Sequence, residues 1–356
     1  MRRLSIPFRL SFWLPCLLGF ALVSGGMERF ARAPFQGPQL GPKLEVLDDR
    51  WAQVDVIFLG SSQIANHLDP EIFDAELARR GHSLTSFNLG LSGMRPVEAE
   101  QILRTLTGLE PRRERWVLID VEPDATRLHQ ENALARRVIS WHDAAAVWRV
   151  LGLLWQTEEL PWSKRLERAQ AHLKAMVRHY SGLGRLAESP QFGFDYYTPS
   201  LGPAGNGFVP MEWALSFEPP ERASDFRSLQ ARRKKLVDDP DQLRRRARAI
   251  VEGEAVAGIE KGSDVAAVGQ LMETARRHGW KPVLILGPRK QLTEQVTMAV
   301  DRGELGPTLR FNDPQDFPWL FDPDLRFDLS HLNAEGAQRY TELVAETFAE
   351  ELLAAP

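Results

Sequence analysis

Cysteine is almost absent from this chain of 356 residues. Cys16 is the one cysteine, and it lies in an uncharged apolar run near the N-terminus. A single thiol cannot form an intramolecular disulfide, and it cannot supply the thiolates of a structural zinc site. Because no cysteine follows Cys16, the rest of the chain contains no cysteine nucleophile.

Neither sign of charge is in large excess. The chain has 44 Lys and Arg against 48 Asp and Glu, a formal net charge of -4. A protein that binds nucleic acid usually carries a basic surface, so we exclude nucleic acid as a partner. The eight histidines are scattered without the spacing of a zinc site, and we predict no metal and no cofactor. No internal repeat and no low-complexity tract is present.

The longest apolar run stands near the N-terminus, behind Arg2, Arg3 and Arg9. As a helix, residues 10–27 would measure about 27 Å, close to the ~30 Å hydrocarbon core of a bilayer. The basic side should stay in the cytoplasm. We predict an uncleaved single-pass anchor over residues 1–33, with a cleaved signal peptide or a buried core helix as alternatives. Both leading interpretations place the remaining chain outside the cytoplasm, on the periplasmic or extracellular side of the inner or cytoplasmic membrane.

Apolar strands and helices alternate over residues 34–125, after a linker rich in Pro and Gly at 34–42. Asp69 can cap a helix that opens at Pro70, and Pro96 opens another. Strands separated by helices are typical of a parallel sheet with both faces covered. Buried strands are predicted at residues 54–59, 84–89, 116–121 and 283–286.

This alternation is lost over residues 126–262, which we predict to be an insertion of helices and loops. Its basic runs at 232–235 and 244–246 are interpreted as solvated helix faces, with contact to anionic lipid or polysaccharide as the alternative. The α/β pattern returns over residues 263–356. The sequence therefore predicts a three-layer α/β/α sandwich with a mostly parallel sheet, divided by the insertion.

Three residues far apart in the chain have the chemistry of a serine-nucleophile site. Ser62 follows the first predicted strand, and Asp328 and His331 precede the last predicted helix. A serine hydroxyl becomes a good nucleophile when an imidazole accepts its proton and a carboxylate orients that imidazole. We therefore predict Ser62 as the nucleophile, His331 as the base and Asp328 as its orienting partner.

Further candidates lie near the same predicted edge of the sheet. Asn88 and Gly93 flank the turn after the second strand and are predicted to line the oxyanion or substrate site, with the Gly93 amide as an oxyanion donor. Arg95 could clamp an anionic substrate group, although a surface arginine is the alternative. His67 is a rival base, for which a surface or loop position is favoured, and His142 is favoured as a structural histidine over a substrate-groove residue.

The order of these segments resembles the SGNH/GDSL hydrolase superfamily. Gly60-Ser61-Ser62 corresponds to its first block, usually Gly-Asp-Ser, and Asn88-Leu89-Gly90-Leu91-Ser92-Gly93 corresponds to its second. Asp328-Leu329-Ser330-His331 matches its final Asp-x-x-His. Residues 120–124 contain no Gly-x-Asn-Asp, so the asparagine that donates to the oxyanion in the family has no counterpart here. The resemblance covers about half of the chain, its two flanks.

The anchor, the insertion and the Gly-Ser-Ser turn resemble the membrane-associated branch, which includes the D-alanyl transfer protein of teichoic acid modification and the alginate O-acetylation proteins. There, a membrane-bound O-acyltransferase carries an acyl group across the bilayer and an SGNH-like protein passes it to a surface polymer. The resemblance implies O-acyl transfer, of the O-acetyl kind, to an exported or cell-envelope polysaccharide. A simple esterase or deacetylase acting on an acylated small molecule is one alternative, and a catalytically silent glycan-binding or assembly protein is the other.

Overall fold

The computed structural model describes residues 15, 19, 37–106, 114–120, 122, 124–128, 133, 135–156, 160–181, 200–216, 224–252, 264–288 and 294–354. The predicted anchor over residues 1–33 lies outside them, apart from two isolated positions. Within the part of the chain that is described, no helix combines the length and the apolar character needed to cross a bilayer.

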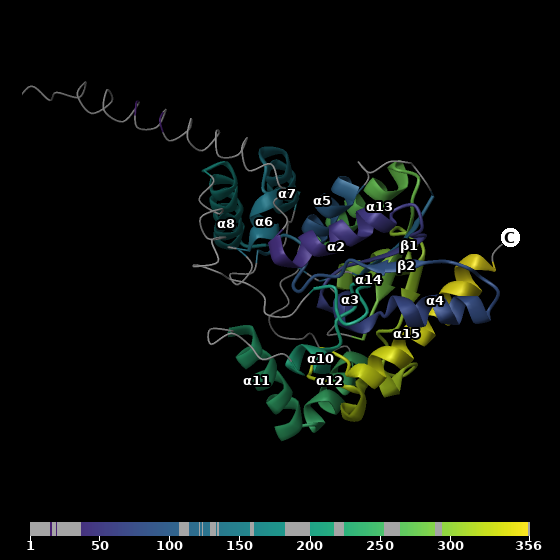
Figure 1. The fold of residues 1–356 in the computed structure, drawn as a ribbon. Coiled ribbons are helices and arrows are strands. Elements are labelled where there is room, and N and C mark those ends of the chain that lie inside the picture. The colour runs from purple at the N-terminus through teal and green to yellow at the C-terminus, as the bar shows by residue number, and fades with distance from the viewer. Residues whose placement is uncertain are drawn as a thin grey trace, which may run out of the picture.

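Five parallel strands form one sheet in the order β2-β1-β3-β4-β5 (Figure 1). The strand order reverses beside β1, because β2 lies on one side of it and β3 on the other. Crevices for ligands in open α/β sheets occur at such reversals, outside the carboxyl ends of the strands. The strands are β1 (Val56–Leu59), β2 (Ser86–Asn88), β3 (Trp116–Asp120), β4 (Lys281–Leu286) and β5 (Thr308–Arg310).

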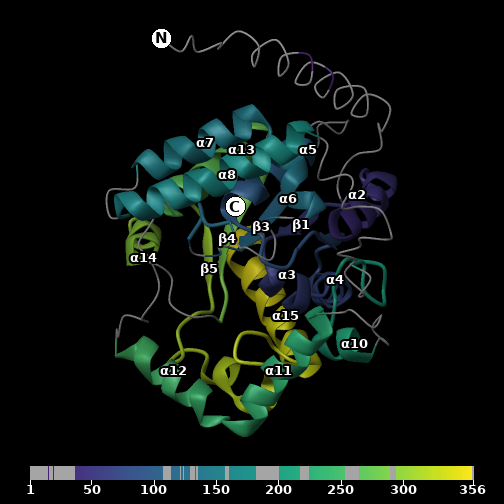
Figure 2. The same ribbon diagram turned by 90° about the vertical axis from the view of Figure 1, so that its left-hand side faces the viewer.

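Helices cover both faces of the sheet (Figure 2). Successive strand residues point to opposite faces, so Ile57 and Phe58 enter different cores. The core with Ile57 packs under α2 (Gly37–Arg50), α5 (Pro96–Leu106), α13 (Asp264–Arg277) and α14 (Glu294–Asp301). The core with Phe58 packs under α3 (Ser62–His67), α4 (Pro70–Arg79), α15 (Ala334–Phe348) and the π-helical turn η3 (Ala349–Leu353).

The predicted α/β architecture is thus confirmed, and the four predicted strands are present: β1, β2 and β3 lie within their predicted ranges, and β4 begins two residues earlier than predicted. The fifth strand, β5, was not predicted, because three residues with one buried side chain give no clear pattern. Asp69 caps α4 as expected, since its side chain accepts a hydrogen bond from the Glu71 amide.

The predicted linker over residues 34–42 is wrong from Gly37 onward, where α2 begins. Leu40, Lys43 and Leu47 share one side of this helix and are buried, although Pro42 lies inside it. A proline beyond the first turn of a helix removes a backbone hydrogen bond, but tertiary packing of an apolar face supplies most helical stability. Burial of this face therefore outweighs the local preference of Pro and Gly.

The helices that the structure describes within residues 126–262 lie in two groups on either side of α3, as Figures 1 and 2 both show. The first group packs on α2 and α5 through α6, and α12 of the second contacts the 3-10 turn η1. The insertion therefore packs on the α/β unit in two places. The helices are α6 (Arg136–Trp141), α7 (Ala144–Gln156) and α8 (Trp162–Ser181), then α10 (Met211–Ser216), α11 (Ser224–Asp238) and α12 (Asp241–Val251); the nearby turns are η1 (Pro318–Phe321) and η2 (Pro323–Leu325).

Candidate active site

A tight strand-to-helix turn places Ser62 at the first position of α3. Ser61 caps that helix, because its Oγ accepts a hydrogen bond from the Gln63 amide at 3.2 Å. The same hydroxyl donates to Asp120 Oδ2 at 2.8 Å. Ser61 therefore ties the turn to the carboxyl end of β3.

Gly60 permits this close contact between the turn and β3. A Cβ at residue 60 would lie 2.7 Å from Asp120 Cβ and 2.7 Å from Ile64 Cγ1, closer than side-chain carbons approach. Asp120 was not predicted as a site residue, although a carboxylate at the carboxyl end of a central strand is a recognisable signal. It fixes the nucleophile turn through Ser61.

The turn after β2 holds α3 from its other side. A Cβ at Gly90 would lie 2.3 Å from the backbone nitrogen of Ala65, so only glycine fits there. Asn88 is fully buried, and its Nδ2 donates to the carbonyls of Ile64 and Leu68, each at 2.7 Å. Both amide protons of Asn88 are used in this way. The structure gives Asn88 a bracing role and offers no support for its predicted contact with substrate.

Gly93 and Arg95 follow in the same segment. Gly93 adopts a left-handed conformation with φ of 67°, and its role as an oxyanion donor stays a prediction. Arg95 is buried, so the alternative of a surface arginine is wrong. Its guanidinium lies 3.4 Å from the Glu122 carboxylate, just past β3. A contact between Arg95 and an anionic substrate group also stays a prediction.

Ser62, His331 and Asp328 form one chain of hydrogen bonds, although 269 residues separate the serine from the histidine. His331 Nε2 lies 2.9 Å from Ser62 Oγ. His331 Nδ1 lies 3.0 Å from each carboxylate oxygen of Asp328. With the Nδ1 proton donated to the carboxylate, Nε2 presents its lone pair to the serine hydroxyl, which is the arrangement of a general base.

The surroundings of Asp328 favour its ionised form. Burial alone would raise the pKa of this carboxyl, but His331, the Ser330 amide and the Arg232 guanidinium outweigh burial and hold the pKa well below its usual range. Oδ1 accepts the backbone N–H groups of Ser330 at 2.7 Å and His331 at 2.8 Å. Asp328 is therefore a fixed anion that can orient His331 and stabilise its protonated form.

His67 was predicted as a surface or loop histidine, and that prediction is wrong. It is the last residue of α3 and is fully buried. Its Nε2 accepts the Leu332 amide at 3.0 Å, and its ring packs edge-on against His331 with 5.8 Å between centroids. Because Nε2 already accepts a backbone proton, His67 serves to position the segment after His331.

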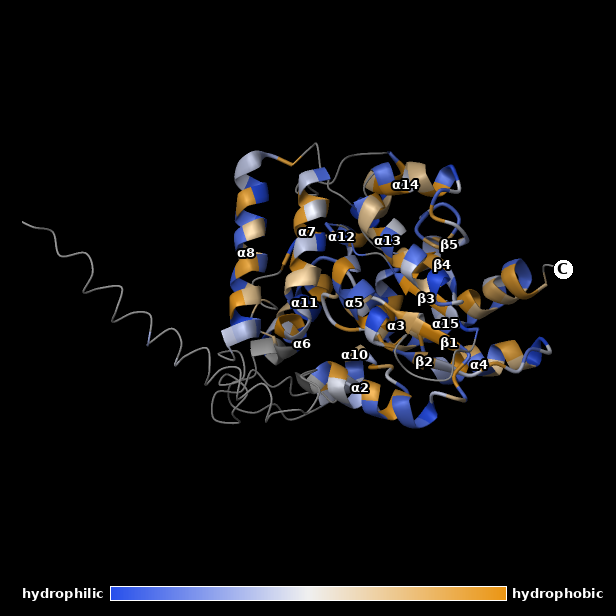
Figure 3. Ribbon diagram, turned by 90° about the horizontal axis from the view of Figure 1, so that it is seen from above, coloured by the Kyte–Doolittle hydropathy of each residue, from blue (hydrophilic) through white to orange (hydrophobic). Residues whose placement is uncertain are grey.

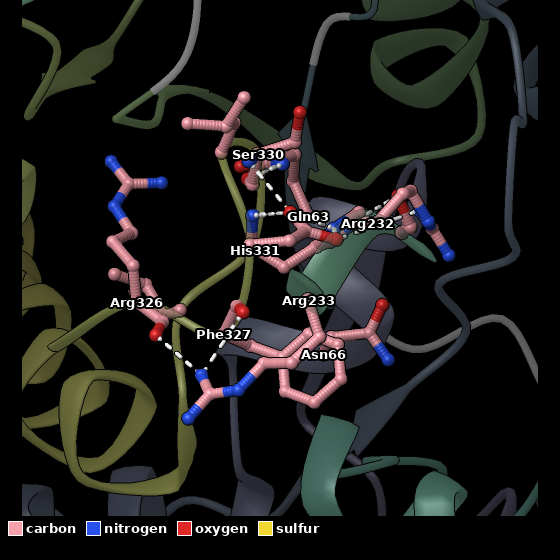
Figure 4. A network of polar contacts seen from close by, with 12 residues as sticks. Gln63, Asn66, Arg232, Arg233, Arg326, Phe327, Ser330 and His331 are labelled. Carbon is pink, nitrogen blue, oxygen red and sulfur yellow. Dashed lines mark hydrogen bonds and ion pairs between the residues drawn. The ribbon is translucent and has the colours of Figure 1, made fainter. Parts of the chain in front are cut away.

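The segment that carries Asp328 and His331 is held by side chains from the insertion (Figure 4). Arg233 of α11 donates through Nη1 to the carbonyls of Arg326 and Phe327, each at 3.0 Å. The Arg233 guanidinium also lies over the Phe327 ring, 5.3 Å from its centroid.

Two further side chains donate hydrogen bonds to backbone carbonyls of the same segment. Arg246 of α12 donates to Leu329 O at 2.9 Å, and Gln63 of α3 donates to Ser330 O at 2.6 Å. Gln63 follows Ser62 in sequence and Ser330 precedes His331, so this bond holds the two segments of the site together. Neither Arg246 nor Gln63 was predicted, because no sequence motif marks a donor to a distant backbone carbonyl.

The basic runs at 232–235 and 244–246 are therefore solvated only in part. Lys234 pairs with Asp238 and Arg244 with Asp241 on exposed surface, as predicted. Arg232, Arg233 and Arg246 instead face the segment around Asp328. A run of charges in sequence does not reveal which of its members a tertiary neighbour will bury.

His142 and His172 form a buried pair between α6 and α8, apart from the triad. His142 Nε2 lies 3.0 Å from His172 Nδ1, and the outer nitrogens face the carbonyls of Val138 and Thr126. Burial lowers the pKa of His142 to about 3 and that of His172 to about 4. These contacts favour the structural role over a place in a substrate groove. Over the residues that the structure describes, no group of metal-ligating side chains is present.

No protein-family model matches the chain, and no curated protein matches its sequence. The case for a function therefore depends on Ser62, His331 and Asp328 and on the elements that hold them. Their arrangement can activate a hydroxyl for attack on a carbonyl carbon.

Proposed function

We propose that this chain is a serine-dependent acyl-transfer enzyme with an SGNH-like three-layer fold. The observation that carries the proposal is the continuous set of contacts from Ser62 Oγ through the His331 ring to the Asp328 carboxylate. Support comes from the position of Ser62 at the carboxyl end of β1, where the strand order reverses.

In the proposed reaction, Ser62 Oγ attacks the carbonyl carbon of an acyl donor while its proton moves to His331 Nε2. The amides of Ser62 and Gly93 are proposed to stabilise the oxyanion. Collapse of the intermediate breaks the bond to the leaving group, which takes the proton from His331. An acceptor hydroxyl then attacks the acyl-serine while its proton moves to His331. The bond between the acyl group and Ser62 Oγ breaks, His331 gives the proton to Ser62 Oγ, and the hydroxyl is regenerated.

The acceptor class and the location are proposed on the family resemblance and on the apolar N-terminal run. We propose a single-pass anchor, a site outside the cytoplasm and an exported or cell-envelope polysaccharide as acceptor. The acyl group would be O-acetyl, delivered through a membrane-bound O-acyltransferase as partner. No metal and no cofactor is needed for this chemistry, because proton transfer and oxyanion stabilisation both come from the protein.

The first experiment is labelling of the full chain in detergent with a fluorophosphonate, which reacts with activated serines. We expect labelling of the natural chain and of Ser216→Ala, because Ser216 is exposed at the end of α10 and its hydroxyl donates only to the Trp213 carbonyl in the contacts described. Ser62→Ala should lose the label. Equal labelling of the Ser62→Ala chain, or none of the natural chain, would contradict the proposal.

A second measurement separates transfer from its alternatives. The chain is supplied with an isotopically labelled acetyl ester and an oligosaccharide acceptor. Label on the oligosaccharide supports transfer, and label released only as acetate indicates an esterase or deacetylase. Neither product, together with equal glycan binding by the natural chain and Ser62→Ala, indicates a silent glycan-binding protein.

A further inference from the structure

One surface of the insertion is unusually apolar. Most of the large hydrophobic side chains that are exposed in the described residues lie on α7 and α8, and Trp148 and Trp162 are 72% and 69% exposed. Figure 3 shows α7 and α8 side by side at one edge of the molecule, with apolar and polar residues alternating along both. We call this surface the hairpin face; it consists of Trp148, Trp155, Trp162, Leu166, Leu173 and Val177.

The hairpin face follows from the spacing of its residues. Trp148 and Trp155 are seven residues apart on α7, and Trp162, Leu166 and Leu173 share one side of α8. A different side of each helix is buried, at Val150 and Leu154 on α7 and at His172 and Ala175 on α8. These exposed residues are therefore a second apolar stripe, additional to the one that packs on the protein.

Contacts at both ends show that the two helices are antiparallel and carry their stripes together. The Trp155 and Trp162 rings pack edge to face, with 6.1 Å between centroids, where α7 ends and α8 begins. At the other end, the Ala144 amide donates to the Tyr180 hydroxyl at 3.0 Å. The stripe on α8 extends over about 23 Å between Trp162 and Val177 at the rise of an α-helix.

The charge of this hairpin is opposite to that of the whole chain. Within α7 and α8, Glu167 is the single acidic residue, and Arg168 is neutralised by buried Asp124 at 2.5 Å. The chain as a whole has a formal net charge of -4. The basic residues of the two helices are Arg149, Lys164, Arg165, Arg168, Lys174 and Arg178.

The hairpin is connected through α6 to α2, the helix that follows the apolar N-terminal run in sequence. α2 begins at Gly37 and packs against α6, which packs against α8. Residues 28–36 can extend over at most about 32 Å. If residues 10–27 cross a bilayer, this short connection holds the hairpin close to the membrane surface.

We propose that the hairpin face lies against the surface of an anionic lipid bilayer. Tryptophan and tyrosine favour the membrane interface, and flanking lysines add attraction to anionic headgroups. A second copy of the chain is a less suitable occupant, because two basic hairpins would repel each other. The proposal shares the anchor with the proposed function and does not depend on the chemistry of Ser62.

The test places a fluorophore on the hairpin face of the full chain in vesicles of phosphatidylcholine and phosphatidylglycerol. In a Cys16→Ala background, Gly152→Cys provides the attachment site, because Gly152 is exposed between Trp148 and Trp155 and a Cβ there meets no atom within 4 Å. Nitroxide lipids labelled near the headgroup should quench this fluorophore about twofold. Arg244→Cys, on exposed α12 at the opposite side of α3, should show almost no quenching.

Two variants test the chemistry of the contact. Replacement of Trp148, Trp155 and Trp162 by serine, and separately of Lys164 and Lys174 by glutamine, should each reduce the quenching at residue 152. In vesicles of phosphatidylcholine alone, which carry no net charge, the quenching of the lysine variant should be closer to that of the parent. Both sets of side chains are exposed, so the fold should be retained.

A label on the natural Cys16 separates this proposal from the anchor. Quenching of that label by deep nitroxide lipids, without quenching at residue 152, would overturn the proposal and leave the anchor intact. Absence of quenching at both positions would overturn both. Energy transfer between chains labelled at residue 152, without quenching by lipid, would identify the hairpin face as a self-association surface and would also overturn the proposal.

Discussion

The two halves of the triad are built in different ways. Ser62 is placed by the backbone, at a strand-to-helix turn where Gly60 and Gly90 allow direct contact with neighbouring elements. His331 lies in a segment outside regular helix and strand, whose carbonyls accept hydrogen bonds from distant side chains such as Arg233 and Arg246. The position of Ser62, the proposed nucleophile, therefore depends on local packing, and the position of His331, the proposed base, depends on tertiary partners.

This difference predicts two classes of effect. Changes beside Ser62 should disturb the fold, because the glycine contacts leave no free space. Changes to the donors around His331 should alter the position of the base while the fold persists, because those donors lie at the periphery. Each of the following predictions tests one side of this comparison.

The largest expected effect belongs to Asp328→Asn. The amide oxygen can still accept the Ser330 and His331 amides, so the local backbone should be kept. The anion that fixes the Nδ1 proton and stabilises protonated His331 is lost, and we expect turnover of an acyl ester to fall about 10³- to 10⁴-fold. Steady-state hydrolysis of an activated acetyl ester measures this.

Asp322→Asn is the matched control for that variant, because Asp322 is a nearby carboxylate that caps the turn η2. It should keep nearly full turnover. Turnover at the parent rate by both Asp328→Asn and Asp322→Asn would refute the orienting role of Asp328.

Gly90→Ala should give the largest loss of stability. Its Cβ would meet the backbone nitrogen of Ala65 at 2.3 Å, and backbone cannot move aside as a flexible side chain can. We expect the free energy of unfolding to fall by about 3 kcal/mol. Gly269→Ala, inside α13 with no atom within 4 Å, should instead stabilise by about 0.5–1 kcal/mol. Chemical denaturation compares them, and equal effects of the two changes would contradict the packing argument.

The buried pair of His142 and His172 differs from His331, because its ring nitrogens face each other and backbone carbonyls, whereas His331 faces the Asp328 carboxylate. The pKa of His172 is lowered to about 4 by burial, so the folded state keeps this ring neutral where the unfolded chain takes up a proton near pH 6.5. Its contribution to stability is complete above about pH 6.5 and is lost as pH falls toward 4. At pH 5 the loss is about 2 kcal/mol.

His172→Gln should remove that part of the pH dependence, and His82→Gln, outside the pair, should leave it unchanged. Unfolding free energies measured between pH 7 and pH 5 check the difference in slope. Identical slopes for the parent and His172→Gln would show that the pair is not held neutral.

Much of the fold was open to prediction from sequence, because its signals are local. Strands buried on both faces are continuous apolar runs, and helices such as α4 have their own caps. The triad residues were also recognisable, since they follow a strand end or precede the last helix. Helix α2 was missed because its stability depends on burial of Leu40 and Leu47, which propensity does not report.

The supports of the site were beyond sequence reasoning for a physical reason. Asp120, Gln63 and Arg246 act through contacts with residues 59, 267 and 83 positions away. Such contacts leave no periodic pattern. His67 was misplaced on the surface for the same reason, because its partner Leu332 is distant in sequence.

The smallest expected effect tests whether the insertion positions the base. Arg246→Met removes the donor to Leu329 O but keeps an apolar stem, so unfolding free energy should change by less than about 1 kcal/mol. Turnover should fall about 5- to 10-fold with little change in KM, because His331 loses its fixed distance to Ser62 while substrate contacts remain. Arg246→Lys, which can still reach a carbonyl, should recover part of the rate. Arg244→Met, on the exposed side of the same helix, should leave kcat unchanged; if it lowers kcat as much as Arg246→Met does, the effect comes from general loss of charge and α12 does not position the base.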